Sequence, residues 1–259
     1  MAVREFSLVK WFMDCVTETG DAAIVYCATL RWRGIHLSMG SLLTSHGLVS
    51  ETHSSLGPYQ VSADDSQILV EHPGLKASGR WLADAEPFKR TIYDGPAGMV
   101  EWNCLQPRSL VNLCIGNRVV TGLGYGECLT LTLPPWHLPM RQLRWGRFVS
   151  QHDSLAWIDW QGKYSTRFAI FNGQFREPMT VSDSEIVLVA ETLRMEDSLS
   201  LRSGRLGATI LPGVSALSKL LPHSLFNVNE QKWRSRGTLR GPERESDGWV
   251  IHEVVDWEL

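Results

Sequence analysis

The chain has 259 residues, with 25 lysines and arginines against 28 aspartates and glutamates, giving a formal net charge of −3. Its 43% hydrophobic and 20% charged residues are ordinary for a globular protein and argue against disorder over most of the chain. The near-neutral charge argues against a dedicated nucleic-acid binder, which normally carries a basic surplus.

Predicted strands dominate the first half of the chain. Residues 22–32 and 35–45 are apolar and rich in β-branched side chains, and Gly34 between them predicts a hairpin. Residues 99–105 and 109–116 predict a second pair of strands joined by a three-residue turn.

A long strand is predicted over residues 118–133, and it carries Gly122, Gly124 and Gly126. Alternate glycines in a strand indicate a bulge or a surface where something approaches the backbone closely. A dinucleotide-binding loop is rejected, because the glycines are followed by the alternating CLTLTL segment and not by a helix.

The second half continues with short strands and one predicted helix. Alternation in SLAWIDW places Leu155, Trp157 and Asp159 on one face and Ala156, Ile158 and Trp160 on the other. The helix is predicted at 214–222, where the apolar spacing is helical and Pro222 ends it. Strands are predicted at 143–150, 154–161, 164–172, 186–189 and 249–259.

Many short strands with at most one or two helices predict an all-β protein, either a sandwich or a barrel. The segment 133–140, LPPWHLPM, holds three prolines and is the best candidate for a linker. We therefore expect two β domains, at residues 1–135 and 136–259.

The cellular context follows from absences in the sequence. The N-terminal residues contain no apolar run of signal-peptide length, and no segment approaches the roughly 18 apolar residues of a membrane span. A cytoplasmic protein without a transmembrane segment is expected, while transient membrane contact and the oligomeric state stay open. Five cysteines with no CxxC pair predict buried thiols, and scattered histidines predict no metal site.

The most informative acid is Glu127, which shares a strand face with Tyr125. A carboxylate beside an aromatic wall can have its pKa raised and act as a general acid. The alternative is a carboxylate in solvent or in a salt bridge. Asp14 and Glu101 also lie in strands beside tryptophans and are either paired structurally or poised for proton transfer.

The RWGRF segment supplies a second candidate group. Trp145 and Arg147 share one strand face, where they could bind an anionic or carbonyl-bearing ligand by stacking and hydrogen bonding. The alternative is an arginine that lies across a surface tryptophan through a cation–π contact.

Four segments together resemble a known group of proteins. KWFMDCVTETGDAAIVYCATLRW, GLGYGECLTL, RWGRF and SLAWIDW resemble, in the same order, segments of the carotenoid 1,2-hydratase (hydroxyneurosporene synthase) and AttH-like superfamily. The resemblance spans roughly residues 8 to 175. It implies two lipocalin-like β domains packed together, with a ligand cavity between or within them, and relatives that include hydratases, cyclases and pericyclase-type enzymes.

The leading hypothesis is a cofactor-independent enzyme that acts on an apolar polyene, terpenoid or polyketide-like molecule, as a lyase (hydratase), isomerase or cyclase. Glu127 would be the general acid, with Asp14 and Tyr125 as further catalytic candidates, and Arg147 or Asn103 would hold a polar end. The pocket and its ligand contacts are predicted at Trp11, Glu101, Trp102, Asn103, Tyr125, Trp145, Arg147, Trp157 and Asp159.

Two other hypotheses stay open. A non-catalytic lipocalin-like carrier of a hydrophobic ligand would use the same aromatic cavity but would need no ionisable group inside it. A protein-interaction module would have no cavity and would expose an apolar patch. A carboxyl inside the cavity favours the enzyme, whereas acids that all point to solvent favour the carrier.

Overall fold

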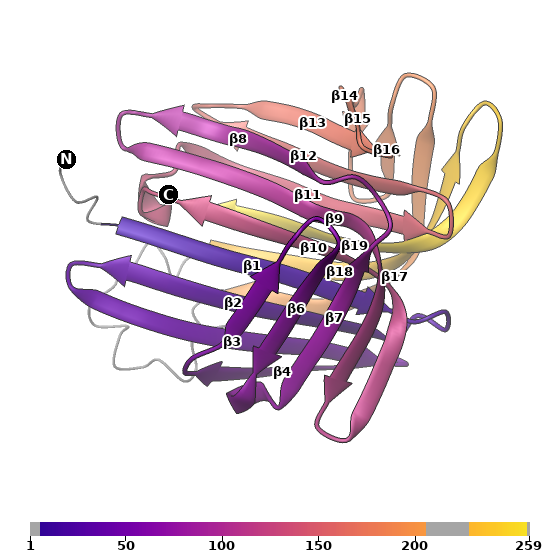
Figure 1. The fold of residues 1–259 in the computed structure, drawn as a ribbon. Helices are drawn as coiled ribbons and strands as arrows, with labels where there is room; N and C mark the ends of the chain where they lie inside the picture. The colour runs from indigo at the N-terminus through magenta and orange to yellow at the C-terminus, as the bar shows by residue number, and fades with distance from the viewer. Residues whose placement is uncertain (1–5, 206–227, 258–259) are drawn as a thin grey trace.

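The computed structural model describes residues 6–205 and 228–257, which form two curved antiparallel sheets (Figure 1). Besides strands, the described residues contain two short 3-10 helices, η1 (Pro73–Leu75) and η2 (Pro135–His137). The helix predicted at 214–222 lies outside the described residues. No helix among the described residues has the length and apolar character needed to cross a membrane.

The first sheet has ten strands in the order β4-β3-β2-β1-β10-β9-β7-β6-β5, and β8 pairs with β9. Its first and last strands in the chain, β1 and β10, are neighbours. The strands are β1 (Phe6–Val16), β2 (Ala22–Trp32), β3 (Ile35–His46), β4 (Val49–Leu56), β5 (Gln60–Ala63), β6 (Gln67–His72), β7 (Ala77–Ala83), β8 (Phe88–Gly95), β9 (Gly98–Ile115) and β10 (Arg118–Leu131).

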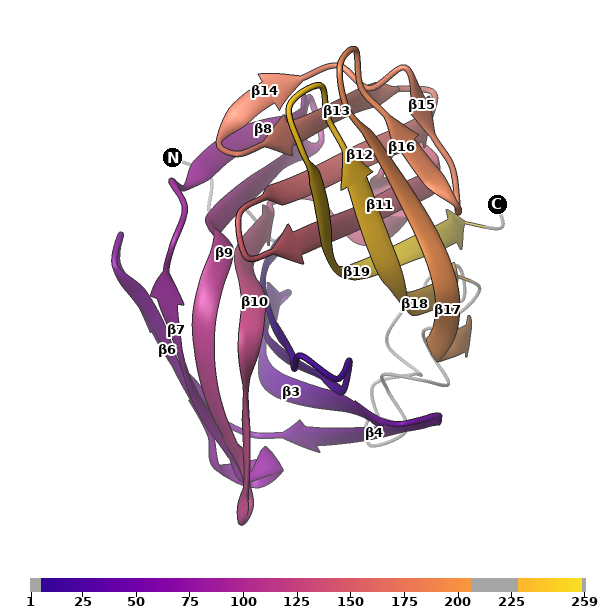
Figure 2. The ribbon, with the colours of Figure 1, turned by 90° about the vertical axis from the view of Figure 1, so that its right-hand side faces the viewer.

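The second sheet has nine strands in the order β14-β13-β12-β11-β19-β18-β17-β16-β15. The strands that come first and last in the chain, β11 and β19, are again neighbours. The two curved sheets lie against each other (Figure 2). The strands are β11 (Met140–Ser150), β12 (Ser154–Gly162), β13 (Thr166–Phe171), β14 (Gln174–Arg176), β15 (Thr180–Val181), β16 (Glu185–Val187), β17 (Thr192–Arg205), β18 (Val228–Arg240) and β19 (Glu245–Trp257).

The all-β class and the two lipocalin-like halves predicted from the sequence are confirmed. The chain passes from β10 of the first sheet to β11 of the second through residues 132–139, which include η2. These residues overlap the proline-rich segment 133–140 that was predicted as a linker, and Met140 already belongs to β11. The division at residue 135 into two domains stays a prediction.

The predicted hairpin around Gly34 is confirmed, because β2 pairs with β3 through a turn at Arg33 and Gly34. Both turn residues have positive φ angles, 47° and 80°, as in the two-residue turns that match the twist of a hairpin.

The prediction of two strands at 99–105 and 109–116 is wrong, since β9 runs through both as one strand. It is paired with β8 over its first part and with β7 over its last part. Pro107 lies between these two stretches, opposite a bulge in the pairing with β10. Proline lacks an N–H group, so it is tolerated where neither neighbouring strand needs one.

The strand predicted at 186–189 also differs from the structure. The strand expected at 186–189 is present only as β16, which ends at Val187, and β17 begins at Thr192 as the second strand of a hairpin. The backbone between them closes the turn, because the Leu188 amide donates to the Glu191 carbonyl.

The main hydrophobic core lies between the two sheets, and smaller clusters lie on the far side of each sheet. Strand β12 separates two of these clusters. Ala156, Ile158 and Trp160 face the core between the sheets, whereas Leu155 and Trp157 pack in the cluster on the far side of the second sheet. The alternation predicted for this strand is therefore confirmed.

The β8–β9 hairpin of the first sheet reaches over β12 and β13 of the second sheet (Figure 1). The ring centroids of Trp102 on β9 and Phe168 on β13 are 5.7 Å apart. The guanidinium of Arg90 on β8 lies 4.6 Å from the same Phe168 ring. Aromatic packing thus holds the two sheets around the space between them.

Candidate functional site

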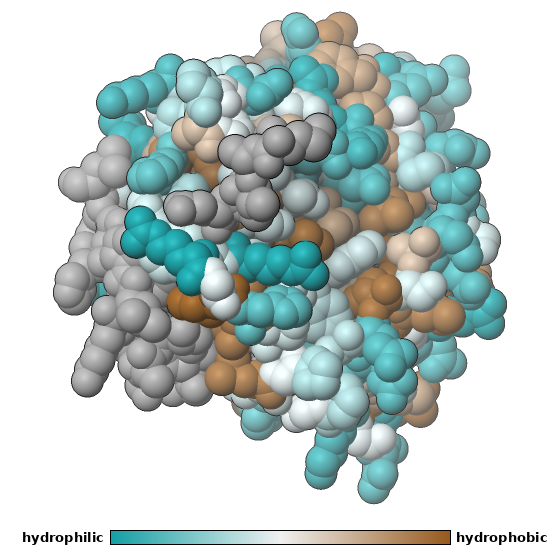
Figure 3. Space-filling view, turned by 60° about the vertical axis from the view of Figure 1, so that its left-hand side comes forward, coloured by the Kyte–Doolittle hydropathy of each residue, from teal (hydrophilic) through white to brown (hydrophobic). Residues whose placement is uncertain are grey.

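A cavity of about 350 Å³ lies between the two sheets, and both sheets contribute to its wall. Most of the wall is apolar. On the face shown in Figure 3, apolar residues also come to the surface between hydrophilic ones. Members of the apolar wall include Leu30, Trp32, Leu37, Leu129, Trp136, Leu143, Trp145, Ile158, Trp160, Val255 and Trp257. A cavity of this size and character suits a small hydrophobic molecule.

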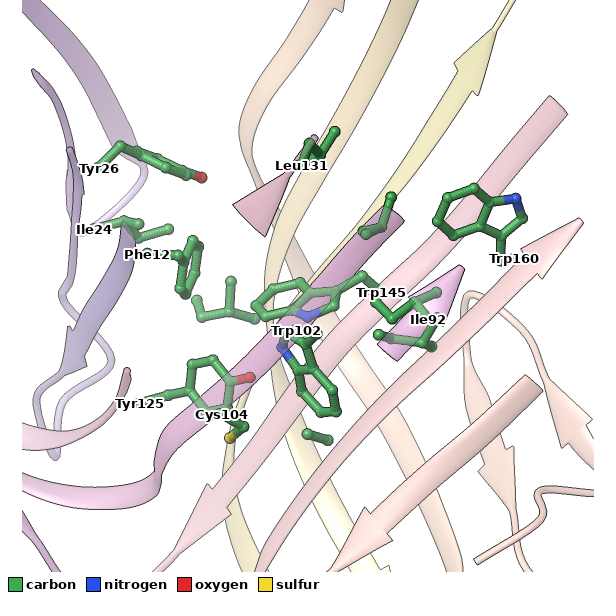
Figure 4. Close-up of a cluster of buried hydrophobic side chains, with 14 of the residues drawn as sticks. Phe12, Ile24, Tyr26, Ile92, Trp102, Cys104, Tyr125, Leu131, Trp145 and Trp160 are labelled. Atoms are coloured by element: carbon green, nitrogen blue, oxygen red, sulfur yellow. The ribbon is translucent and has the colours of Figure 1, made fainter. Parts of the chain in front are cut away.

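Glu127 is one of the few ionisable side chains in this wall, and only 7% of its surface is exposed. Its Oε2 atom accepts two hydrogen bonds, at 2.5 Å from Nε1 of Trp102 and at 2.6 Å from the hydroxyl of Tyr125. Because both hydrogen bonds are donated to Oε2, Oε1 is the oxygen that can carry the proton. Trp102, Tyr125 and Trp145 converge here from three strands (Figure 4).

Burial raises the pKa of Glu127 above its ordinary value of 4.5. The hydrogen bonds from Tyr125 and Trp102 and the positive charge of Lys10 act in the opposite direction, but they do not outweigh desolvation. The carboxyl therefore keeps its proton to a higher pH than an exposed glutamate does. It has the environment of a general acid.

The glycines of β10 explain how Glu127 reaches this position. The pairing of β10 with β9 shifts register between Gly124 and Gly126 and again between Gly126 and Glu127. A Cβ on Gly124 would stand 2.1 Å from the backbone oxygen of Asp14 on β1. The predicted bulge and the predicted close backbone approach are thus both present.

Tyr125 lies behind Glu127 and is fully buried. Burial raises the pKa of its hydroxyl well above the ordinary value, and the neighbouring Cys104 and Glu127 act in the same direction. The hydroxyl therefore stays protonated and donates to Glu127. Its ring packs edge-on against Trp145, with the ring centroids 5.8 Å apart.

Asp14 and Arg147 form a buried ion pair that joins the two sheets. Nε and Nη2 of Arg147 donate to the two carboxylate oxygens of Asp14, at 2.9 and 2.6 Å. Nη1 of Arg147 donates to the Trp249 carbonyl at 2.7 Å. Neither Asp14 nor Arg147 is among the described residues that line the cavity. Asp14 and Arg147 therefore have a structural role, because their hydrogen bonds go to each other and to the Trp249 carbonyl.

The structure separates the other predicted site residues. Trp102 and Trp145 line the cavity, whereas Trp11 and Trp157 pack in the clusters on the far sides of their sheets. Asp159 accepts hydrogen bonds from Arg167 and Gln161 away from the cavity.

Two predicted contacts on β9 also lie outside the cavity wall. Glu101 pairs with Lys89 at 2.8 Å, and alternation places Glu101 and Asn103 on the opposite face of β9 from Trp102. Neither is among the described residues that line the cavity.

A group of charged residues at one end of the cavity was missed by the sequence reasoning. Arg202, Glu230 and Glu253 line the cavity, and Lys232 is buried beside them. Arg202 Nη2 donates to Glu230 Oε1 at 2.6 Å, and Lys232 Nζ lies 3.4 Å from the same oxygen. Lys232 also pairs with Glu253. Burial alone would raise the pKa of Glu230, but Lys232 and Arg202 lower it to about 2, so this acid is ionised.

Within the part of the chain that the structure describes, no three side chains of histidine, cysteine, aspartate or glutamate gather as a group of metal ligands.

Comparison with known proteins links the chain to solved structures through its fold. No protein-family model matches the sequence. No curated protein matches it either.

Three solved structures share the fold over nearly the whole chain. An AttH-like protein from Nitrosomonas europaea superposes with a TM-score of 0.60 at 8% identity, over 97% of this chain and 93% of the other. Kievitone hydratase from Nectria haematococca superposes with a TM-score of 0.60 at 9% sequence identity, over 100% of this chain and 94% of the other. CghA in complex with Sch210972 superposes with a TM-score of 0.55 at 11% sequence identity, over 97% of this chain and 89% of the other. The fold that the resemblance implied is therefore confirmed.

Proposed function

We propose that the chain is an enzyme that acts on an apolar small molecule, and that Glu127 is its general acid. The observation that carries this proposal is a carboxyl with a raised pKa in the wall of an apolar cavity. The fold supports it, because one protein of the same fold is a hydratase. A carrier would need no such group in its binding site.

The proposed step is protonation of a carbon–carbon double bond or an enol. The proton leaves Oε1 of Glu127, the π electrons form the new carbon–hydrogen bond, and the positive charge stays on the neighbouring carbon or, for an enol, on its oxygen. The Trp102 and Tyr125 donors stabilise the carboxylate that is left. A general acid contributes about 10²–10⁴-fold to a rate, so substrate positioning must supply the rest.

Three outcomes are open to the cation, and each is a different reaction. Addition of water, which then loses a proton to the Glu127 carboxylate, gives a hydratase. Loss of another substrate proton to Glu127 gives an isomerase. Attack by a second double bond of the substrate moves the charge to a new carbon, and loss of a proton from there to Glu127 gives a cyclase. The faces of Trp102 and Trp145 in the cavity wall would stabilise the positive charge. The step uses only groups of the protein, its substrate and water.

The proposal is tested by deuterium incorporation. The protein is incubated in D₂O with a panel of polyenes, terpenoids and enolisable polyketides, and carbon-bound deuterium is measured by mass spectrometry after back-exchange in water. We expect incorporation with the wild type and none with Glu127→Gln, which keeps a hydrogen-bond acceptor for Trp102 and Tyr125.

The matched control is Glu101→Gln, which changes a glutamate of β9 that faces away from Trp102. It should keep the wild-type rate of incorporation. Incorporation that survives in Glu127→Gln would show that the acid is wrongly assigned. Ligands that bind with no incorporation by the wild type would support the carrier.

A further inference from the structure

At the polar end of the cavity, and beside it, are buried atoms that have no hydrogen-bond partner among the described residues. They are Nε and Nη1 of Arg202, the hydroxyl of Tyr26 and Oε2 of Glu230. Arg202 and Glu230 line the cavity, and each is at least nine-tenths buried. Buried polar groups normally find a hydrogen-bond partner, so unused guanidinium N–H groups on a side chain that lines a cavity indicate a ligand.

Three cations surround the ring of Tyr26. Lys10 Nζ lies 5.3 Å from the ring centroid, Arg202 Cζ 5.2 Å and Lys232 Nζ 5.7 Å. Tyr26 itself directs its hydroxyl toward the space between the sheets (Figure 4). Burial raises the pKa of this hydroxyl to about 12, although the cations act against it, so it remains a donor.

Charge in this cluster does not balance. Lys10, Arg202 and Lys232 face two carboxylates that form ion pairs, Glu230 and Glu253. In the described part of the chain no carboxylate lies within ion-pair distance of Lys10, which also lines the cavity. Among these groups the cations therefore exceed the ion-paired carboxylates by one. Lys10 is half-buried, and a monoanion at this end of the cavity would supply the counter-charge that the described residues do not.

We propose that this end of the cavity binds a single anionic oxygen group, a carboxylate or an ionised enol, at the end of an otherwise apolar ligand. Arg202 and Tyr26 would donate hydrogen bonds to it, and Lys10 would supply the second positive charge. Glu230 holds the Arg202 guanidinium through Nη2 and leaves Nε and Nη1 for the ligand.

The head group would also act on the general acid of the proposed function, on which this role depends. The positive charge of Lys10 lowers the pKa of Glu127. An anion beside Lys10 would offset that charge and keep Glu127 protonated when the substrate is bound. A substrate without the anion would lose this effect on the pKa of Glu127 as well as its contacts with Arg202 and Lys10.

Binding of decanoate and 1-decanol to the whole protein tests the head group without any need for turnover. Affinity is measured by calorimetry or by tryptophan fluorescence. We expect the wild type to prefer decanoate by about 10–100-fold, the size of one or two charge-assisted hydrogen bonds. Methyl decanoate, which keeps the oxygens and lacks the charge, should bind like the alcohol. An ionised enol is then compared by using the enolate of an alkyl 1,3-dicarbonyl.

The variants locate the preference. Arg202→Gln should weaken it, because the hydrogen bonds that Arg202 donates are lost. The double variant Arg202→Gln/Glu230→Gln should weaken it too, since Lys10 is then the remaining attraction for the anion, and it leaves no unpaired carboxylate. Thermal melting checks that both variants fold. Arg240→Gln is the matched control, because Arg240 pairs with Glu245 at an exposed position of the same sheet. It should keep the wild-type preference.

Equal affinity for decanoate and 1-decanol in the wild type would overturn the inference, and so would an undiminished preference in the folded double variant. Failure of both ligands to bind would overturn it too, because an open apolar cavity with a cationic end must accept decanoate. Glu127→Gln should keep the decanoate preference. A preference that persists while Glu127→Gln still incorporates deuterium would refute the general acid and leave the head-group site standing.

Discussion

Asp14 and Arg147 join the two sheets by two parallel hydrogen bonds between side chains that are 0% and 1% exposed. The carboxylate comes from β1 and the guanidinium from β11. Such a pair fixes how the two sheets face each other and therefore the width of the cavity between them.

Removing one partner of this pair should destabilise the protein strongly. For Asp14→Asn we expect the free energy of unfolding to fall by about 3–5 kcal/mol, because Arg147 is left as a buried charge. The double variant Asp14→Asn/Arg147→Met should lose less than the sum of the two single variants. Chemical denaturation of all four proteins measures the coupling. Additive losses would show that the two side chains do not act as a pair.

Glu127 should make the protein less stable as the pH rises. Its folded-state pKa is raised above 4.5, so the folded protein holds a proton that the unfolded chain releases. Its stabilising contribution is present in full below about pH 4.5 and is lost as the pH rises through the folded-state pKa. Glu127→Gln should show a flatter dependence of unfolding free energy on pH in this window. Identical curves for the two proteins would contradict the raised pKa.

Tyr125→Phe should shift the pH profile of activity upward. The Tyr125 hydroxyl lowers the pKa of Glu127 through its hydrogen bond, so its loss should raise that pKa further. The alkaline limb, where the acid loses its proton, should move to higher pH while the maximal rate falls. Deuterium incorporation measured against pH gives both quantities. A lower rate with an unmoved limb would indicate a purely structural role for the hydroxyl.

Gly124→Ala should destabilise the protein by about 1–3 kcal/mol, the usual cost of overpacking. Its Cβ would stand 2.1 Å from the backbone oxygen of Asp14, and a backbone atom cannot turn away as a flexible side chain can. Gly241→Ala is the control, because the nearest atom to its Cβ would be 3.6 Å away. Thermal melting compares the two, and equal melting temperatures would show that β1 and β10 have room to separate.

The local pattern of the sequence predicted strands and their faces well. In β12 alternation sorted Trp157 from Trp160 correctly, and in β10 it placed Tyr125 and Glu127 side by side. It could not tell which face of β12 meets the other sheet, because that depends on packing between distant strands. Trp157 was therefore assigned to the pocket although Trp160 lines it.

The charged end of the cavity was beyond sequence reasoning for the same kind of reason. Arg202 and Glu230 meet only because β17 and β18 pair in one particular register. A lysine and a glutamate two positions apart, as in Glu230 and Lys232, look like an exposed strand face. Burial of both reverses that interpretation. Pro107 led to the wrong prediction of two strands in place of β9, since a proline inside a run of strand residues usually marks a turn.

The pairing of β1 with β10 and of β11 with β19 has a consequence for synthesis of the chain. In each half the strand that is synthesised first pairs with the strand that is synthesised last. Neither sheet can therefore complete its pairing until nearly all of that half has left the ribosome. Contacts between residues so far apart in sequence form slowly. Until then one edge of β1, and later one edge of β11, presents unpaired backbone groups to other growing chains.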